Sequence, residues 1–108
     1  MAYMAPMASK GQGAVWFKIY EEGRDNKKDY WAVDRIYEAK GYFDVVIPAD
    51  IAPGDYYLRP EVIALHEGNR EYGEDEDAGA QYYNGCIQLH VTGTGTAVPP
   101  GTDMTKAY

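Results

Sequence analysis

Residues 56–66, YYLRPEVIALH, form the longest run of alternating character in the chain and constrain its fold more than any other feature. A period of two is the side-chain period of a β-strand, so this run predicts one long strand. One face of that strand is expected to carry Tyr56, Leu58, Val62, Ala64 and His66, and the other Tyr57, Arg59, Glu61, Ile63 and Leu65. Pro60 has no N–H to donate to a ladder, which predicts an edge or a bulge at that point.

Shorter alternating runs predict further strands before and after it. These strands are expected at residues 14–21 (AVWFKIYE), 30–37 (YWAVDRIY), 42–47 (YFDVVI) and 86–91 (CIQLHV). In the second of them, the spacing of Val33, Ile36 and Tyr37 also fits a helical turn. Several short strands separated by turns predict an all-β fold, an antiparallel β-sandwich or part of one, as a single domain over residues 1–108. Its core is expected to contain Phe17, Ile19, Val45, Ile47, Leu58, Val62, Ile87, Leu89 and Val91.

The segments between these runs are rich in Pro, Gly and charge. Residues 22–29 and 48–55 have turn chemistry, and residues 93–108 are expected to be a coil tail. The stretch 67–80 carries six acids and one Arg. Its spacing matches no calcium-binding loop, so we expect a solvated loop rather than an ion site.

The net charge of −7 excludes two classes of partner. Nucleic acids and anionic membranes attract clustered Lys and Arg, which this chain does not have. No apolar run approaches the length that spans a bilayer, and the first ten residues lack the features of a secretory signal. The eleven tyrosines point elsewhere, because their flat apolar faces suit sugar rings as well as protein cores.

Candidate chemical groups are few, since the common hydrolase, phosphate-binding and zinc motifs are missing. A histidine at a strand end, such as His66 or His90, is more often a structural residue than a ligand. The stretch GAQYYNGC, residues 79–86, places Gln81, Tyr83 and the only cysteine, Cys86, within six residues. Cys86 is either a small buried hydrophobe or half of a bridge to a partner outside the chain.

Three stretches resemble the fungal lytic polysaccharide monooxygenases, auxiliary-activity family nine, formerly glycoside hydrolase family sixty-one. They are WFKIYEEG, IPADIAPGDYYLRPEVIALH and GAQYYNGCIQLHVTGTGTAVPPGT, and the similarity is most specific over residues 47–101. The resemblance implies the middle-to-late part of a secreted catalytic domain with an immunoglobulin-like β-sandwich fold. It also implies copper-dependent oxidative cleavage of cellulose or related β-glucans in the full-length family.

The resemblance assigns roles to three residues. His66 matches the histidine of the family's ALH motif and Gln81 the glutamine of its GAQ motif, and both are expected to act beside the oxygen species in catalysis. Tyr83 matches the tyrosine on the axial side of the copper. Because the strand period is two, Gln81 and Tyr83 are expected on one face. Cys86 matches a cysteine that is normally bridged to a partner near the front of the domain.

The family's copper is held by a histidine brace that this chain does not contain, because the chain starts with Met1 and no histidine precedes the YMA strand. We therefore expect no tight copper binding and no stand-alone family reaction from this chain. The alternative interpretation is a non-catalytic, truncated β-sandwich that retains polysaccharide binding through exposed tyrosines. In both interpretations the partner is cellulose or a β-glucan. A third interpretation is a structural fragment that has neither property.

Overall fold

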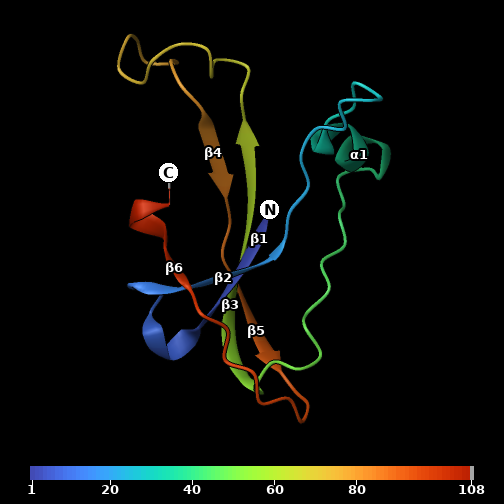
Figure 1. Cartoon of the computed structure of the whole chain (residues 1–108), viewed down its shortest axis with the longest axis vertical. Coiled ribbons are helices and arrows are strands. Elements are labelled where there is room, and N and C mark those ends of the chain that lie inside the picture. The colour runs from blue at the N-terminus through green and yellow to red at the C-terminus, as the bar shows by residue number, and fades with distance from the viewer. Residues whose placement is uncertain (108) are drawn as a thin grey trace.

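An antiparallel sheet built around one long strand makes up most of the structure (Figure 1). The computed structural model describes residues 1–107. Within that range the strands are β1 (Ala2–Pro6), β2 (Ala14–Tyr20), β3 (Gly54–Ala64), β4 (Gln81–Asn84), β5 (Ile87–Val91) and β6 (Thr102–Asp103). The helical elements are α1 (Ala32–Glu38) and two 3-10 turns, η1 (Met7–Ser9) and η2 (Met104–Lys106). The strand order is β4-β3-β1-β2-β6, and β5 also pairs with β3, which confirms the predicted antiparallel β class.

The long strand β3 has different partners along its two halves. On one edge, β1 pairs with β3 from Tyr56 to Pro60. On the other edge, β5 pairs with residues 54–58 and β4 pairs with residues 61–64. The change from β5 to β4 falls opposite Pro60, whose carbonyl accepts a hydrogen bond of 3.1 Å from the N–H of Gly85. The missing N–H of Pro60 thus coincides with the point at which the partner of β3 changes, rather than with the sheet edge or bulge expected there.

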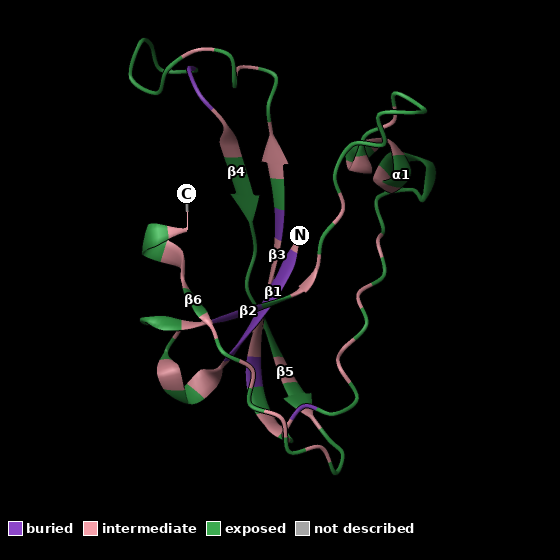
Figure 2. Cartoon of the chain, viewed as in Figure 1, coloured by how far each residue is buried: buried purple, intermediate pink, exposed green. Residues whose placement is uncertain are grey.

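The core lies where β1, β2 and β3 meet, and it occupies both faces of the sheet. Alternation along β1 sends Met4 to one face and Tyr3 to the other. The first cluster consists of Met4, Phe17, Ile51 and Tyr56, and the second of Tyr3, Ala5 and Trp16. Figure 2 shows that the buried positions gather around this meeting point. The hairpin of β3 and β4 and the arm that carries α1 (residues 21–53, between β2 and β3) are largely exposed.

The predicted core is only partly correct. Phe17 is buried, and Ile19, Ile47, Leu58 and Val91 pack against the same cluster. Val45 and Leu89 are half-buried. Val62 and Ile87 are exposed, so their assignment to the core was wrong. Both lie on parts of the sheet that no second layer of residues 1–107 covers.

Two of the predicted strands do not form. Residues 30–37 are predicted to be extended, but α1 begins at Ala32, which agrees with the alternative that the helical spacing of Val33, Ile36 and Tyr37 left open. The Asp34 carboxylate accepts the N–H of Trp31 at 2.7 Å and so satisfies a free donor at the start of the helix. Residues 42–47 have strand-like composition but no neighbouring strand to pair with in the described part of the chain, and they form irregular coil.

The C-terminal segment is more ordered than the coil tail that we expected for residues 93–108. It contains β6 and η2, and β6 pairs with β2. Gly101 runs so close to β2 that a Cβ there would meet the Val15 backbone at 2.4 Å. A glycine is therefore needed for this segment to dock on the sheet. The helices in residues 1–107 are all too short and too polar to cross a membrane.

Replacement of Met4 by Ala tests whether the core is centred on β1. Met4 is fully buried, so Met4→Ala should lower the free energy of unfolding by about 3 kcal/mol. Met7 in η1 is only half-buried, and Met7→Ala is the matched control, with an expected loss of about 0.5 kcal/mol or less. Urea unfolding measures both. Equal losses for the two variants would contradict the position of the core.

Candidate functional site

The hairpin formed by β3 and β4 brings together two of the three site residues predicted from the sequence. Its register pairs Ala64 with Gln81 and Val62 with Tyr83, so that Gln81 and Tyr83 lie two positions apart on one strand. The Tyr83 hydroxyl donates a hydrogen bond of 2.7 Å to Oε1 of Gln81. This bond uses the carboxamide oxygen as acceptor, and the NH₂ group of the same carboxamide is a further donor.

The third predicted residue, His66, lies in the turn that follows β3, two residues beyond the Ala64–Gln81 pair. Its side chain is exposed. The position therefore puts the imidazole at the same end of the hairpin as Gln81. Its approach to Gln81 and Tyr83 within one polar patch stays a prediction.

The acidic loop between the two strands is organised by Arg70. The Arg70 guanidinium contacts the Glu67 carboxylate at 2.7 Å and also pairs with Asp75. The N–H of Gly79 donates to the Glu67 carbonyl at 3.0 Å and closes the base of the loop. In residues 1–107 no three His, Cys, Asp or Glu side chains gather as a metal site. Glu67 and Asp75 thus form ion pairs with Arg70 within the loop.

The two histidines of the chain are too far apart to share one metal ion. The His90 ring nitrogen lies 2.7 Å from the Asp55 carboxylate, near the start of β3, whereas His66 follows the end of β3. The nine residue steps from Asp55 to Ala64 correspond to about 30 Å of extended strand. A mononuclear copper site with two histidines needs both imidazoles within bonding distance of one ion. The side chains of residues 1–107 therefore do not fit such a site on their own.

The cysteine of the GAQYYNGC stretch lies between β4 and β5. Cys86 is exposed and has a free thiol within the described structure. The interpretation of Cys86 as a small buried hydrophobe was therefore wrong. The thiol lies at the interruption of the ladder, where the chain leaves β4 before it pairs again as β5.

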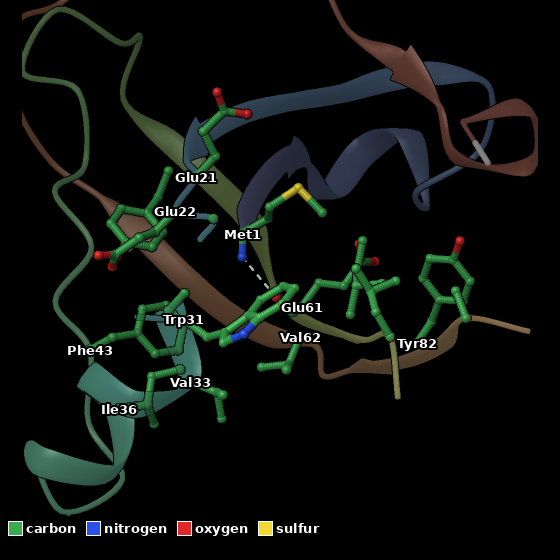
Figure 3. Close-up of a pocket in the computed structure, with 16 residues that line it drawn as sticks. Met1, Glu21, Glu22, Trp31, Val33, Ile36, Phe43, Glu61, Val62 and Tyr82 are labelled. Carbon is green, nitrogen blue, oxygen red and sulfur yellow. Dashed lines mark hydrogen bonds between the residues drawn. The ribbon is translucent and has the colours of Figure 1, made fainter. Parts of the chain in front are cut away.

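A large apolar groove, which we call the β3–α1 groove, separates the C-terminal half of β3 from the arm that carries α1 (Figure 3). It encloses about 680 Å³. Its apolar walls are formed by Trp31, Val33, Ile36, Phe43, Val62 and Leu65, and Tyr82 of β4 also lines it. Sequence analysis did not predict this groove, because its two walls lie about thirty residues apart in the chain and α1 was expected to be a strand.

The floor of the groove contains a buried acid with its counter-ion. The Glu61 side chain is fully buried, and its carboxylate accepts a hydrogen bond of 2.7 Å from Arg59. The Met1 amine donates to the Glu61 carbonyl at 2.8 Å, and the Glu61 N–H donates to the Met1 carbonyl at 2.9 Å. Burial lowers the pKa of the Met1 amine, and the negative charge of Glu61 opposes that shift. Pairing of Glu61 with Arg59 offsets the cost of burying the carboxylate.

Polar contacts hold the outer wall of the groove in place. Arg35 of α1 pairs with Glu22 at 2.8 Å, and the Arg24 guanidinium lies 5.5 Å from the centre of the Trp31 ring. The Tyr30 hydroxyl donates to the Glu38 carboxylate at 2.5 Å, and this hydrogen bond raises the pKa of Tyr30 to about 12. These exposed contacts fix α1 to the loop before it, and they contribute little to overall stability.

Comparison with known proteins places this geometry in a class. The solved structure titled "CvAA9A" matches 99% of this chain with a TM-score of 0.92 at 39% identity, and the match covers 49% of that chain. Cel61B from Hypocrea jecorina, a glycoside hydrolase family 61 member, matches with a TM-score of 0.79 at 28% identity, over 99% of this chain and 47% of its own. The curled antiparallel sheet is thus that of an immunoglobulin-like β-sandwich of the polysaccharide monooxygenase type.

The sequence comparisons agree with the structural ones. An AA9 family lytic polysaccharide monooxygenase A from Aspergillus clavatus is 47% identical over 109 residues, all of this chain and 28% of that protein. A protein of the same name from Collariella virescens is 42% identical over 91% of this chain and 36% of its own length. The profile of Auxiliary Activity family 9 (formerly GH61) matches residues 1–108, and the chain belongs to this family. It spans about half the length of the solved relatives.

Thiol labelling of the native protein tests the position of Cys86. Because the side chain is exposed, we expect one thiol per folded chain to react with a thiol reagent as fast as it does in the urea-unfolded chain, within about tenfold. Unreduced protein should give the same count of one. Protection of the thiol in the native state that is lost in urea would contradict the exposed position. A count near zero would show that Cys86 is already bridged to another molecule.

Proposed function

We propose that this chain supplies His66, Gln81 and Tyr83 to the oxidative site of a lytic polysaccharide monooxygenase that acts on cellulose or a related β-glucan. The histidines that bind copper are provided by residues that this chain does not contain. Gln81 presents its NH₂ group as a hydrogen-bond donor, Tyr83 holds the carboxamide in place, and the exposed imidazole of His66 can donate or accept a proton.

The observation that carries this proposal is the Tyr83–Gln81 hydrogen bond of 2.7 Å on β4. It joins Gln81 and Tyr83, which the family resemblance assigns to one site. The other strand of their hairpin, β3, ends two residues before His66, the third residue of that site. Family membership supports the substrate class, because the family consists of copper-dependent monooxygenases that act on polysaccharides such as cellulose. Its members are secreted fungal enzymes, which supports an extracellular location for the protein.

Titration with Cu(II) tests whether the copper ligands lie outside this chain. Since the two imidazoles lie at opposite ends of β3, the chain alone should show no tight one-to-one complex by calorimetry. His66→Ala and His90→Ala form a matched pair and should change the titration equally little. A tight one-to-one complex that is lost in His66→Ala and retained in His90→Ala would overturn the proposal that the ligands come from elsewhere.

A fusion protein tests the roles of the site residues. It joins this chain to the part of CvAA9A that the structural match does not cover. The joined protein should bind copper tightly and cleave cellulose with peroxide. His66→Ala and Gln81→Ala should each slow turnover by roughly tenfold or more while copper affinity changes less. Tyr42→Ala, an exposed tyrosine on the α1 arm, is the control and should leave turnover unchanged. Unaltered turnover in both site variants would contradict their assigned roles.

The exposed tyrosines support a second candidate function, polysaccharide binding without chemistry. Tyr82 and Tyr83 on β4 are 43% and 60% exposed, and Tyr72 in the adjoining loop is 94% exposed. Aromatic rings at such positions offer apolar faces to sugar rings. If this is the function, the chain alone should sediment with cellulose, and Tyr83→Ala should weaken sedimentation several-fold more than the control Tyr42→Ala. Equal effects of the two variants would contradict binding through β4.

A further inference from the structure

The only Asn–Gly dipeptide of the chain, Asn84–Gly85, lies at the end of the β3–β4 hairpin, where β4 ends. Asn84 is the last residue of β4, and both residues of the dipeptide are exposed. The other two asparagines, Asn26 and Asn69, are also exposed, but a lysine and an arginine follow them. Glycine has no Cβ, so Asn84 is the asparagine whose following residue least hinders a reaction between its side chain and the main chain.

We propose that Asn84–Gly85 is a site of spontaneous covalent modification, at which the asparagine loses ammonia and becomes aspartate or isoaspartate. The main-chain nitrogen of Gly85 attacks the side-chain carbonyl carbon of Asn84, and the new C–N bond closes a cyclic imide. The C–N bond of the carboxamide breaks, and its nitrogen leaves as ammonia with the proton of the Gly85 N–H. Water then opens the imide at either carbonyl. The first step is intramolecular, which favours it over attack by a separate molecule.

The fold controls this reaction through two backbone contacts. The Gly85 N–H donates a hydrogen bond of 3.1 Å to the Pro60 carbonyl, and a nitrogen held in this way is not free to attack. Asn84 also pairs with Glu61 in the ladder, which keeps its backbone extended. Attack therefore requires this end of the hairpin to open. Opening costs little there, because the side chains of β4 belong to neither of the two core clusters of residues 1–107.

The products alter the hairpin that carries the candidate site. Asn84 directly follows Tyr83, whose hydroxyl bonds to Gln81. In isoaspartate the main chain runs through the side-chain carbons, so it gains a backbone atom between β4 and β5, and the strand register changes there. Aspartate places a carboxylate directly opposite Glu61, and like charges at paired positions destabilise an antiparallel pair. The reaction needs neither copper nor polysaccharide, so this inference does not rest on the proposed function.

Incubation of the folded chain at mildly alkaline pH, followed by peptide mapping with mass spectrometry, tests the proposal. Conversion at Asn84 should be at least about tenfold faster than at Asn26 or Asn69, which are internal references in the same sample. Isoaspartate, detected by enzymatic methylation, should be among the products, because direct hydrolysis of the carboxamide gives aspartate alone. Equal conversion at the three asparagines, or aspartate without isoaspartate, would overturn the proposal.

Replacement of the glycine tests which nitrogen attacks. Gly85→Ala should slow conversion at Asn84 by at least about tenfold, because its methyl group hinders the attacking nitrogen. The new Cβ would lie 3.5 Å from Pro60, an ordinary contact, so the variant should fold, and its far-UV spectrum should match that of the parent chain. Gly23→Ala is the matched control, because a Cβ there meets no atom within 4 Å, and it should leave conversion unchanged. Equal rates in Gly85→Ala and the parent chain would contradict attack by the nitrogen of residue 85.

The same incubation in urea tests the control that the fold exerts. Conversion at Asn84 should be faster in the unfolded chain than in the folded one. The ratio of the two rates should match the hydrogen-exchange protection of the Gly85 N–H in the folded chain within about tenfold, since both processes need the same opening. An equal rate of conversion in the two states would contradict control by the hydrogen bond to Pro60.

Discussion

Between Tyr56 and Leu58, strand β3 pairs with β1 on one edge and with β5 on the other, so that its backbone donors and acceptors are satisfied within the sheet. The same segment carries Tyr56, which packs edge-to-face on Phe17 with ring centres 6.3 Å apart. Hydrogen bonding and apolar burial therefore reinforce each other in this half of the strand. Beyond Pro60 the situation changes, because β1 ends at Ala2 and, after the Met1–Glu61 hydrogen bonds, only β4 continues the ladder. The stable half thus supports the hairpin that presents the candidate site.

The position of the site follows from this division. The hairpin of β3 and β4 projects from the packed part of the sheet, and it holds Gln81 and Tyr83 in register through backbone bonds rather than through a core. Its apolar surface lies open in the β3–α1 groove, across from α1. Residues on such a hairpin are weakly supported, because a strand pair held by backbone hydrogen bonds without a packed core opens at a low free-energy cost.

The alternation of apolar and polar residues in the sequence predicted three of the strands correctly. The runs at residues 14–21, 56–66 and 86–91 correspond to β2, β3 and β5. Periodicity did not predict β1, because the run Ala2–Pro6 (AYMAP) is short and has no polar–apolar alternation, and its burial depends on two neighbouring strands. The family resemblance alone indicated a strand there.

The wrongly predicted elements depend on contacts with residues far away in the sequence, which a local sequence pattern does not show. Residues 42–47 have strand composition, yet a strand needs a neighbour to pair with. Val62 and Ile87 have core-like positions in their strands, yet burial needs a second layer. At the site, strand parity predicted that Gln81 and Tyr83 share a face, and their hydrogen bond agrees with it. The groove could not be predicted, because it depends on where the α1 arm lies relative to β3.

Site-resolved amide hydrogen exchange along β3 tests this account most directly. The account predicts slow exchange at Tyr56, Tyr57 and Leu58, where strands flank both edges, and exchange at least roughly tenfold faster at Ile63 and Ala64, where only β4 pairs. Nuclear magnetic resonance measures both sets of amides in one sample of the isolated chain. Equal protection along the whole of β3, or slower exchange at its β4 end, would contradict the division at Pro60.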